Sequence, residues 1–220
     1  MTYTYDSTGE FAHDTQFVRG TAQPYAEHGG GKGAANRYEA ANGYDGNVYD
    51  ADQTRFEYNA SPAEVYADLL NKVKALTGTE TSWISATANV SSLLWYLFST
   101  LDKRVNWCGF YFYDSVSDEL QLGPFQGRVA CQSIKLGKGV CGVAGDLRTT
   151  QLVPDVREFP GHIACDGETR SEIVVPVVSE DGLLRAVLDI DSTELNAFDT
   201  HDQFYLEQLS HLLSKGCRWP

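Results

Sequence analysis

Beyond residue 57, apolar residues first recur at helical spacing. Ser61-Pro62 followed by Glu64 predicts a helix start, because serine caps a first turn and proline fits its first position. Gly78 is placed to end this helix. A second helix is predicted over about 83–101. The apolar positions of the two helices are Val65, Leu69, Val73 and Leu76, then Leu93, Leu94, Leu97, Phe98 and Leu101.

The pattern then changes to short strands. Residues 105–113 are aromatic and strand-like, and 119–125 alternates after a turn at 114–118, which predicts an antiparallel hairpin. Further strands are predicted over 128–134 and 151–153, with a turn at 137–139 and a short helix over 140–144 between them. A second hairpin is predicted from strands at 172–178 and 184–191 around a turn at 180–182.

A last helix is predicted over about 199–215. Its expected buried face consists of Phe204, Leu206, Leu209, Leu212 and Leu213. Helices, strands, a loop-rich middle, a hairpin and a closing helix together predict an α+β fold, with a mostly antiparallel sheet flanked by helices.

Residues 1–57 have a different composition, rich in Gly, Asp, Asn, Ala and Tyr, with the flexible run 29–33. Such a segment has too few clustered aliphatic residues to offset its ordering entropy. We therefore predict a disordered or loosely docked extension over 1–57 and one folded domain over 58–220. Binding of a partner through the tyrosines of the extension is the alternative.

Charge and cysteine usage limit the classes of function. The net charge of −13 and the pI of about 4.7 argue against nucleic acid, and no basic amphipathic helix or long apolar run indicates a membrane. The N-terminus lacks the pattern of a secretion signal, so a cytoplasmic location is expected. The five cysteines are then expected to be reduced or catalytic, and their odd number leaves at least one unpaired.

The loop that begins at Pro154 carries Cys165 and leads into the strand at 172–178. It shows no helical or strand period and is crowded with ionisable groups, which favours a functional loop. A lone cysteine is often a small buried hydrophobe. The loop position and the polar neighbours of Cys165 favour a reactive thiol instead.

Cys131 and Cys141 lie in the same central region as Cys165. Their separations match structural zinc poorly, and 137–142 lacks the ending of a phosphate-binding loop, so no metal site is predicted. Cys–His acyl transfer with His162 stays open, without an assignable third residue. Thiol redox chemistry, with one attacking and one or two resolving thiols, fits best.

Three acids add a source of protons. Asp189 and Asp191 are two residues apart on one strand and therefore face the same side, and Glu172 begins the preceding strand. Asp189 lies within an apolar run, where a carboxyl is either paired or protonated because an isolated buried charge is too costly. A protonated acid is able to donate to a leaving oxygen at neutral pH.

Taken together, these motifs resemble the free methionine-(R)-sulfoxide reductases, the stand-alone GAF-domain type, over roughly residues 83–215. The matching segments are Asn-Trp-Cys-Gly-Phe-Tyr at 106–111, Leu-Gly-Pro-Phe-Gln-Gly at 122–127, Ala-Cys-Gln at 130–132, Gly-Lys-Gly-Val-Cys-Gly at 137–142, Val-Pro-Asp-Val at 153–156, Pro-Gly-His-Ile-Ala-Cys-Asp-Gly-Glu-Thr at 160–169, Ser-Glu-Ile-Val-Val-Pro at 171–176 and Asp-Ile-Asp at 189–191.

The resemblance implies roles for the thiols. Cys165 matches the attacking cysteine, Cys131 matches the thiol that resolves the sulfenic acid, and Cys141 matches a second thiol that takes part. Cys108 and Cys217 match no functional thiol. The resemblance also implies free methionine-(R)-sulfoxide as substrate and thioredoxin, regenerated with NADPH, as reductant, without a tightly bound cofactor or metal. A homodimer is compatible with the sequence.

It further implies a substrate pocket. Glu172, Asp189 and Asp191 match the acids that hold the substrate amine and protonate the sulfoxide oxygen. Trp107 and Tyr111 match the aromatic wall around the methyl-sulfur end. The alternatives are a non-enzymatic GAF sensor of a small ligand or of redox state, and a peroxidase-like thiol scavenger. Turnover of the sulfoxide separates the reductase from both.

Overall fold

The computed structural model describes residues 54–77, 81–162 and 166–220. Within them, six strands form one antiparallel sheet in the order β4-β3-β2-β7-β6-β5. The strands are β2 (Val105–Asp114), β3 (Glu119–Gly127), β4 (Ser133–Lys135), β5 (Gln151–Val153), β6 (Ser171–Val178) and β7 (Leu184–Ser192). The helices are α1 (Pro62–Leu76), α2 (Trp83–Thr100), α3 (Gly139–Leu147) and α4 (Thr200–Gly216), with a short 3-10 turn over Val156–Glu158.

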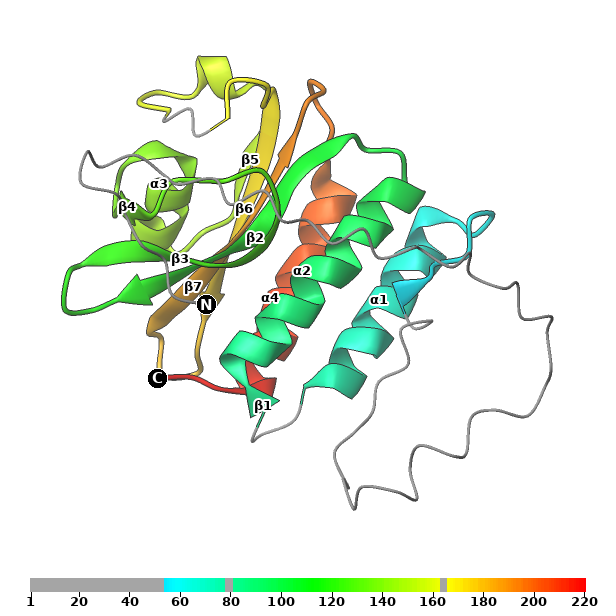
Figure 1. The fold of residues 1–220 in the computed structure, drawn as a ribbon, viewed down its shortest axis with the longest axis horizontal. Coiled ribbons are helices and arrows are strands. Elements are labelled where there is room, and N and C mark those ends of the chain that lie inside the picture. The colour runs from blue at the N-terminus through cyan, green and yellow to red at the C-terminus, as the bar shows by residue number, and fades with distance from the viewer. Residues whose placement is uncertain (1–53, 78–80, 163–165) are drawn as a thin grey trace, which may run out of the picture. The chain divides into compact units, whose positions relative to one another are not determined.

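The helices divide between the two faces of the sheet. Figure 1 shows α1, α2 and α4 side by side in one layer, while α3 lies apart from them, near β4 and β6. A two-residue strand, β1 (Thr81–Ser82), pairs in parallel with β8 (Cys217–Arg218) and joins the start of α2 to the end of the chain. The predicted α+β architecture is therefore confirmed. No helix in the described ranges is long and apolar enough to cross a bilayer.

Strand alternation gives the sheet two different faces. On β2, Cys108 and Phe110 belong to the large core beneath the three-helix layer, whereas Trp107 and Tyr111 belong to a smaller core beneath α3. Successive strand residues point to opposite faces, so every second residue of β2 faces α3. The smaller core is therefore where side chains of β2, β6 and β7 meet α3.

Local signals fix the ends of two helices as expected. Ser61 caps α1 and accepts from the backbone N–H of Glu64, whose carboxylate accepts from the backbone N–H of Ser61 in return. Asp199 and Asp202 make the same reciprocal pair at the start of α4. Each such cap contributes about 1 kcal/mol. The helix that Gly78 was expected to end has Thr77 as its C-cap, and Gly78 lies outside the described residues.

Two predictions about the fold are wrong. The strand predicted over 128–134 is reduced to β4, because the chain leaves the sheet at Gly127, whose φ of 124° few other residues adopt. Phe204 is 58% exposed, because the buried stripe of α4 runs through Asp202, Leu206 and Leu209, and Phe204 lies on the opposite side of the helix. The predicted extension falls mostly on residues 1–53, outside the described residues, and its boundary with the domain stays a prediction.

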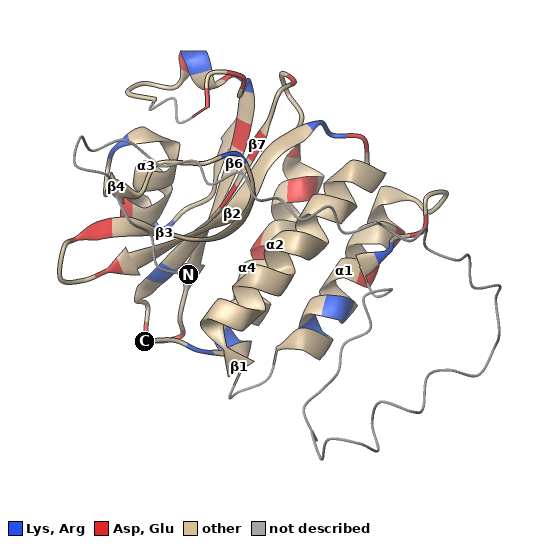
Figure 2. Cartoon of the chain, viewed as in Figure 1, with Lys and Arg blue, Asp and Glu red and all other residues tan. Residues whose placement is uncertain are grey.

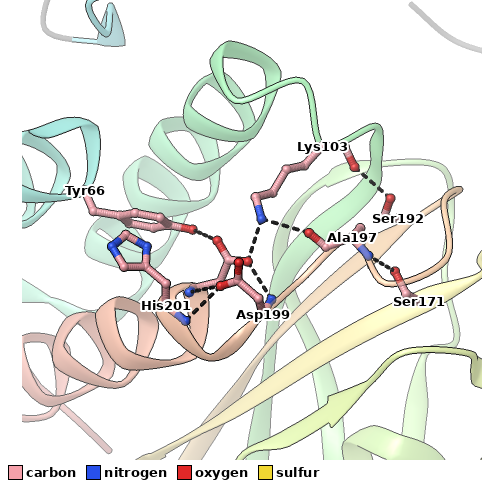
Figure 3. Close-up of polar contacts among 8 residues, drawn as sticks. Tyr66, Lys103, Ser171, Ser192, Ala197, Asp199 and His201 are labelled. Atoms are coloured by element: carbon pink, nitrogen blue, oxygen red, sulfur yellow. Dashed lines mark hydrogen bonds and ion pairs between the residues drawn. The ribbon is translucent and has the colours of Figure 1, made fainter. Parts of the chain in front are cut away.

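A buried polar cluster ties α1 and α4 to the start of β2. The carboxylate of Asp202 accepts from Tyr66 Oη at 2.6 Å and from Lys103 Nζ at 2.6 Å, and Lys103 also donates to the Ala197 carbonyl at 2.8 Å (Figure 3). Asp202 is only 2% exposed, so its charge depends on these donors. The cluster holds the segment between β7 and α4 against the end of the sheet.

Two serines extend this cluster to the strand ends. Ser192 Oγ donates to the Lys103 carbonyl at 2.7 Å, and Ser171 Oγ accepts from the Ala197 backbone N–H at 3.2 Å (Figure 3). Ser171 and Ser192 face one another across β6 and β7. Both are fully buried, and each directly adjoins an acid that the sequence placed in the site, Glu172 or Asp191.

We predict that Lys103→Met lowers the free energy of unfolding by about 3 kcal/mol, because it removes the only cation recorded for the buried Asp202 among the described residues. The matched control is Lys215→Met, whose ion pair with Glu180 is largely exposed and contributes less than about 1 kcal/mol. Urea unfolding of both variants measures the difference. Equal losses in the two variants would contradict the importance given to the buried pair.

Candidate active site

A small cavity lies between the sheet and α3. Strand side chains line it from Trp107 and Tyr111 on β2 to Glu172 on β6 and to Asp189 and Asp191 on β7. Cys141 of α3 covers it, and its free volume is about 40 Å³. Figure 2 shows acidic positions in red on the adjoining strands β6 and β7. The structure therefore brings together the three acids, the two aromatic residues and one of the thiols that the sequence predicted.

The antiparallel register explains how the acids meet. Glu172 pairs with Asp191 across β6 and β7, and Asp189 pairs with Val174, two residues further along β6. All three acids lie at positions that face α3, and Glu172 and Asp189 are only 5% and 6% exposed. The Oδ1 atom of Asp189 is buried without a hydrogen-bond partner in the described part of the chain.

No cation balances these carboxylates among the described residues. None of the recorded ion pairs involves Glu172, Asp189 or Asp191. Burial, reinforced by the neighbouring acids, raises the pKa of Glu172 and of Asp191 well above the usual range. Burial also raises the pKa of Asp189, to about 6. The group therefore retains protons at a pH at which isolated carboxyls have lost theirs.

Cys141 lies beside the acids because α3 approaches β4 closely. A side chain at Gly142 would come within 2.3 Å of the Lys135 carbonyl oxygen, so glycine is required for this approach. Cys141 Sγ is 3.9 Å from Glu172 Oε1. Burial, together with the charges of Asp189 and Glu172, raises the pKa of the Cys141 thiol well above its usual range. Cys141 is therefore a neutral thiol in this state, and a poor nucleophile at neutral pH.

An aromatic wall forms the other side of the cavity. Trp107 stacks on Tyr111 with ring centroids 5.6 Å apart and on Phe125 at 5.2 Å. The indole Nε1 of Trp107 is buried and has no acceptor among the described residues. A buried indole N–H normally finds a partner, so this donor is available to a bound molecule.

The segments at the rim contribute residues that the sequence reasoning left without a role. Asn106 Nδ2 donates to Asp166 Oδ2 and to Thr169 Oγ1, both at 3.2 Å, and Arg128 forms an ion pair with Glu168 at 3.1 Å. These contacts join the start of β2 and the segment after β3 to the loop that follows Cys165. Asn106 and Thr169 lie within the matching segments at 106–111 and 160–169. Their contact becomes visible only in the folded chain.

His162, considered above as a partner for a nucleophilic thiol, also lines the cavity. Its Nδ1 is buried without a partner in the described part of the chain, and burial lowers its pKa. The imidazole is therefore neutral at neutral pH. No carboxylate among the described residues accepts a hydrogen bond from Nδ1 to orient the ring as a general base.

The thiols fall into two groups. Cys131 is partly buried against the smaller core and is disulfide-bonded, while Cys141 is free. Cys108 and Cys217 are free and belong to the large core on the opposite face of the sheet. Cys165, the predicted attacking thiol, lies outside the described residues.

Comparison with known proteins first identifies the class. The model of the GAF domain family matches residues 87–215, more than half of the chain. The range runs from within α2 to the end of α4 and therefore includes the whole six-stranded sheet. The chain belongs to the GAF domain family.

Three relatives narrow the identification. The free methionine-R-sulfoxide reductase of Saccharomyces cerevisiae is 45% identical over 170 residues, which are 77% of this chain and 94% of the relative. That of Escherichia coli is 44% identical over 69% of this chain and 88% of its own length. The X-ray structure of free methionine-R-sulfoxide reductase from Neisseria meningitidis with its substrate is 41% identical, with a TM-score of 0.67 over 74% of this chain and 94% of that chain. The chain is a member of the free methionine-R-sulfoxide reductase family, and thus an oxidoreductase.

The raised pKa values of the acids predict how stability depends on pH. A folded-state pKa above the unfolded value means that the native state binds more protons, so stability falls as pH rises through the folded value. For Asp189 this window runs from 3.8 to about 6 and corresponds to a loss on the order of 3 kcal/mol. Asp189→Asn removes this loss and also the charge that raises the pKa of Glu172 and Asp191.

We therefore expect Asp189→Asn to become more stable relative to the wild type as the pH rises from about 4 to about 7.5. Urea unfolding at several pH values measures the difference. Asp146→Asn, an exposed aspartate on α3, is the matched control and should show little change. A constant stability difference between Asp189→Asn and the wild type would show that the acids are ionised throughout.

Proposed function

We propose that this chain reduces free methionine-(R)-sulfoxide to methionine, with the oxidised enzyme restored by the dithiol of thioredoxin. The observation that carries the proposal is the group of Glu172, Asp189 and Asp191, which faces an aromatic wall and lacks a cation among the described residues. The ammonium group of an amino acid pairs with the acids, and an apolar sulfur end packs against the aromatic wall. The relatives named free methionine-R-sulfoxide reductase support the same substrate.

The substrate ammonium is placed against the acids. Asp189 Oδ1 is a buried acceptor without a partner among the described residues, Asp191 follows it on β7, and Glu172 pairs with Asp191 from β6. An ammonium group beside these acids donates to Asp189 Oδ1 and so removes the cost of an unpaired buried acceptor. Its positive charge also offsets the repulsion among the carboxylates. A peptide nitrogen brings neither the charge nor three donors, so the site favours the free amino acid.

The sulfur end is placed against Trp107 and Tyr111. Stacked rings offer a flat apolar surface for the methyl group, and the unpartnered Trp107 Nε1 offers a donor for a substrate oxygen. Because the pKa of Glu172 is raised, its carboxyl is a source of a proton for the departing sulfoxide oxygen at neutral pH. Hydrogen bonding or protonation of that oxygen makes the sulfur more electrophilic.

The reduction proceeds in three thiol steps. The thiolate of Cys165 attacks the sulfoxide sulfur, the oxygen passes to the cysteine sulfur with a proton from the acids, and methionine leaves with Cys165 as a sulfenic acid. The Cys131 thiol then displaces water from the sulfenic acid and forms a disulfide. A dithiol reduces this disulfide and becomes oxidised itself.

The state of the cysteines supports this order. Cys131 is disulfide-bonded, which fits a thiol that closes a disulfide, whereas Cys108, Cys141 and Cys217 are free. Cys141 stays protonated beside Glu172, and we give it a secondary role in resolution.

Thioredoxin-coupled consumption of NADPH tests the function. We expect turnover with free methionine-(R)-sulfoxide, little with the (S) epimer, and a loss on the order of 10²-fold or more with the N-acetylated (R) substrate, whose amine carries no charge. No turnover with any sulfoxide would favour a ligand or redox sensor. Equal rates with the free and the acetylated substrate would contradict the placement of the ammonium.

The resolving thiol has its own test. Cys131→Ser should release about one methionine per active site in a single turnover and then stop as a sulfenic acid, because the condensing thiol is missing. Mass spectrometry and methionine quantification measure this, with Cys217→Ser as the control that keeps cycling. Cycling of Cys131→Ser with thioredoxin at the wild-type rate would remove Cys131 from the main route.

A further inference from the structure

We propose that Cys141, Glu172 and Asp189 form a binding site for a zinc ion, which inhibits the enzyme by occupying the position of the substrate ammonium. The inhibition rests on the proposed function, whereas the binding of the ion does not. The site differs from a structural zinc site, since its three ligands come from α3, β6 and β7.

The geometry suits a small dication. One ligand atom from each of the three residues lies within 4.8 Å of the other two, and Cys141 Sγ is 3.9 Å from Glu172 Oε1. Tetrahedral zinc, with Zn–S of about 2.3 Å and Zn–O of about 2.0–2.2 Å, places its ligand atoms roughly 3.3–3.7 Å apart. The ligand atoms therefore need to approach one another by roughly 1.5 Å at most.

A second observation points to a ligand at this position. Asp189 lines the cavity and is only 6% exposed. Its Oδ1 atom is buried and has no hydrogen-bond partner among the described residues. A buried acceptor without a donor is rare in folded proteins. The free volume of about 40 Å³ admits an ion with one or two water molecules.

The ligand set selects the kind of metal. One thiolate and two carboxylates suit zinc or cadmium, whereas magnesium and calcium prefer six or more oxygen ligands. On binding, the Cys141 sulfur gives its proton to solvent and becomes a thiolate ligand. The cavity supplies the fourth position, which water occupies, so the site has three protein ligands and one open position.

The sequence gives no sign of this site. Cys141 and Glu172 are 31 residues apart, and Asp189 lies on a further strand, so no closely spaced ligand pair exists. Only the pairing of β6 with β7 and the position of α3 above them bring the three atoms together. The prediction that the chain has no metal site rested on cysteine spacing and on the family resemblance, and neither reflects this three-dimensional arrangement.

The disulfide form of the full chain allows a binding test without turnover. In this form Cys131 is not available as a ligand, and Cys141, Cys108 and Cys217 remain as thiols. Cadmium chloride is the probe, because a cadmium–thiolate bond adds an ultraviolet charge-transfer band. We expect one equivalent to saturate the signal, Cys141→Ser to abolish it, and the control Cys217→Ser to keep it.

A second variant, Asp189→Asn, tests the site independently of whether Cys141→Ser folds. Asp189→Asn should weaken cadmium binding at least tenfold, with circular dichroism like that of the wild type. The absence of a band in the wild type, or a band that survives in Cys141→Ser, would overturn the metal site.

Zinc chloride added to the coupled assay tests inhibition. We expect reversible inhibition that rising substrate concentration relieves and that a chelator removes. Inhibition that substrate does not relieve would overturn the overlap with the ammonium position. A cadmium band in a chain that turns over no sulfoxide would support the metal site and overturn the proposed function, and turnover without a band would do the reverse.

Discussion

Mutual repulsion among three neighbouring carboxylates, two of them buried, governs this site. Glu172, Asp189 and Asp191 line one cavity without a cation from the described residues, so the three acids cannot all ionise at acceptable cost. Retained protons relieve the repulsion, as the raised pKa values indicate. A bound cation relieves it in another way. The same constraint therefore provides an acid for the sulfoxide oxygen, a site for an ammonium group and an affinity for a soft dication.

Packing on the opposite face of the sheet offsets the free-energy cost of placing these acids together. The large core beneath α1, α2 and α4 supplies the apolar burial, while the strand residues that face α3 are free to be polar. The cluster of Tyr66, Lys103 and Asp202 then holds the chain beyond β7 in place, and through Ser171 and Ser192 it fixes the ends of the two strands that carry the acids. Rigid strands keep like charges close when separation would otherwise be favoured.

Much of this architecture could be predicted from local patterns. The capping signal at Ser61, the two hairpins and the period-two spacing of Asp189 and Asp191 all act over a few residues, and the structure agrees with each. The strand over 128–134 failed because a positive φ at Gly127 leaves no mark in apolar spacing. The contact of Cys141 with Glu172 and the contact of Asn106 with Asp166 depend on strand order and on the crossing of α3, which a linear pattern does not encode. Family resemblance supplied the site residues, and the register of the sheet explains why they meet.

Proton exchange on ligand binding tests the role of the acids most directly. Isothermal titration calorimetry of the reduced protein with methionine sulfone, at pH 7 in buffers of different ionisation enthalpy, counts the protons released. An ammonium placed among carboxyls with raised pKa values lowers those values, so the account predicts release of about one proton for each ligand bound. Asp189→Asn should release fewer. Binding with no net proton exchange would show that the carboxyls are already ionised in the empty site, and would contradict the account.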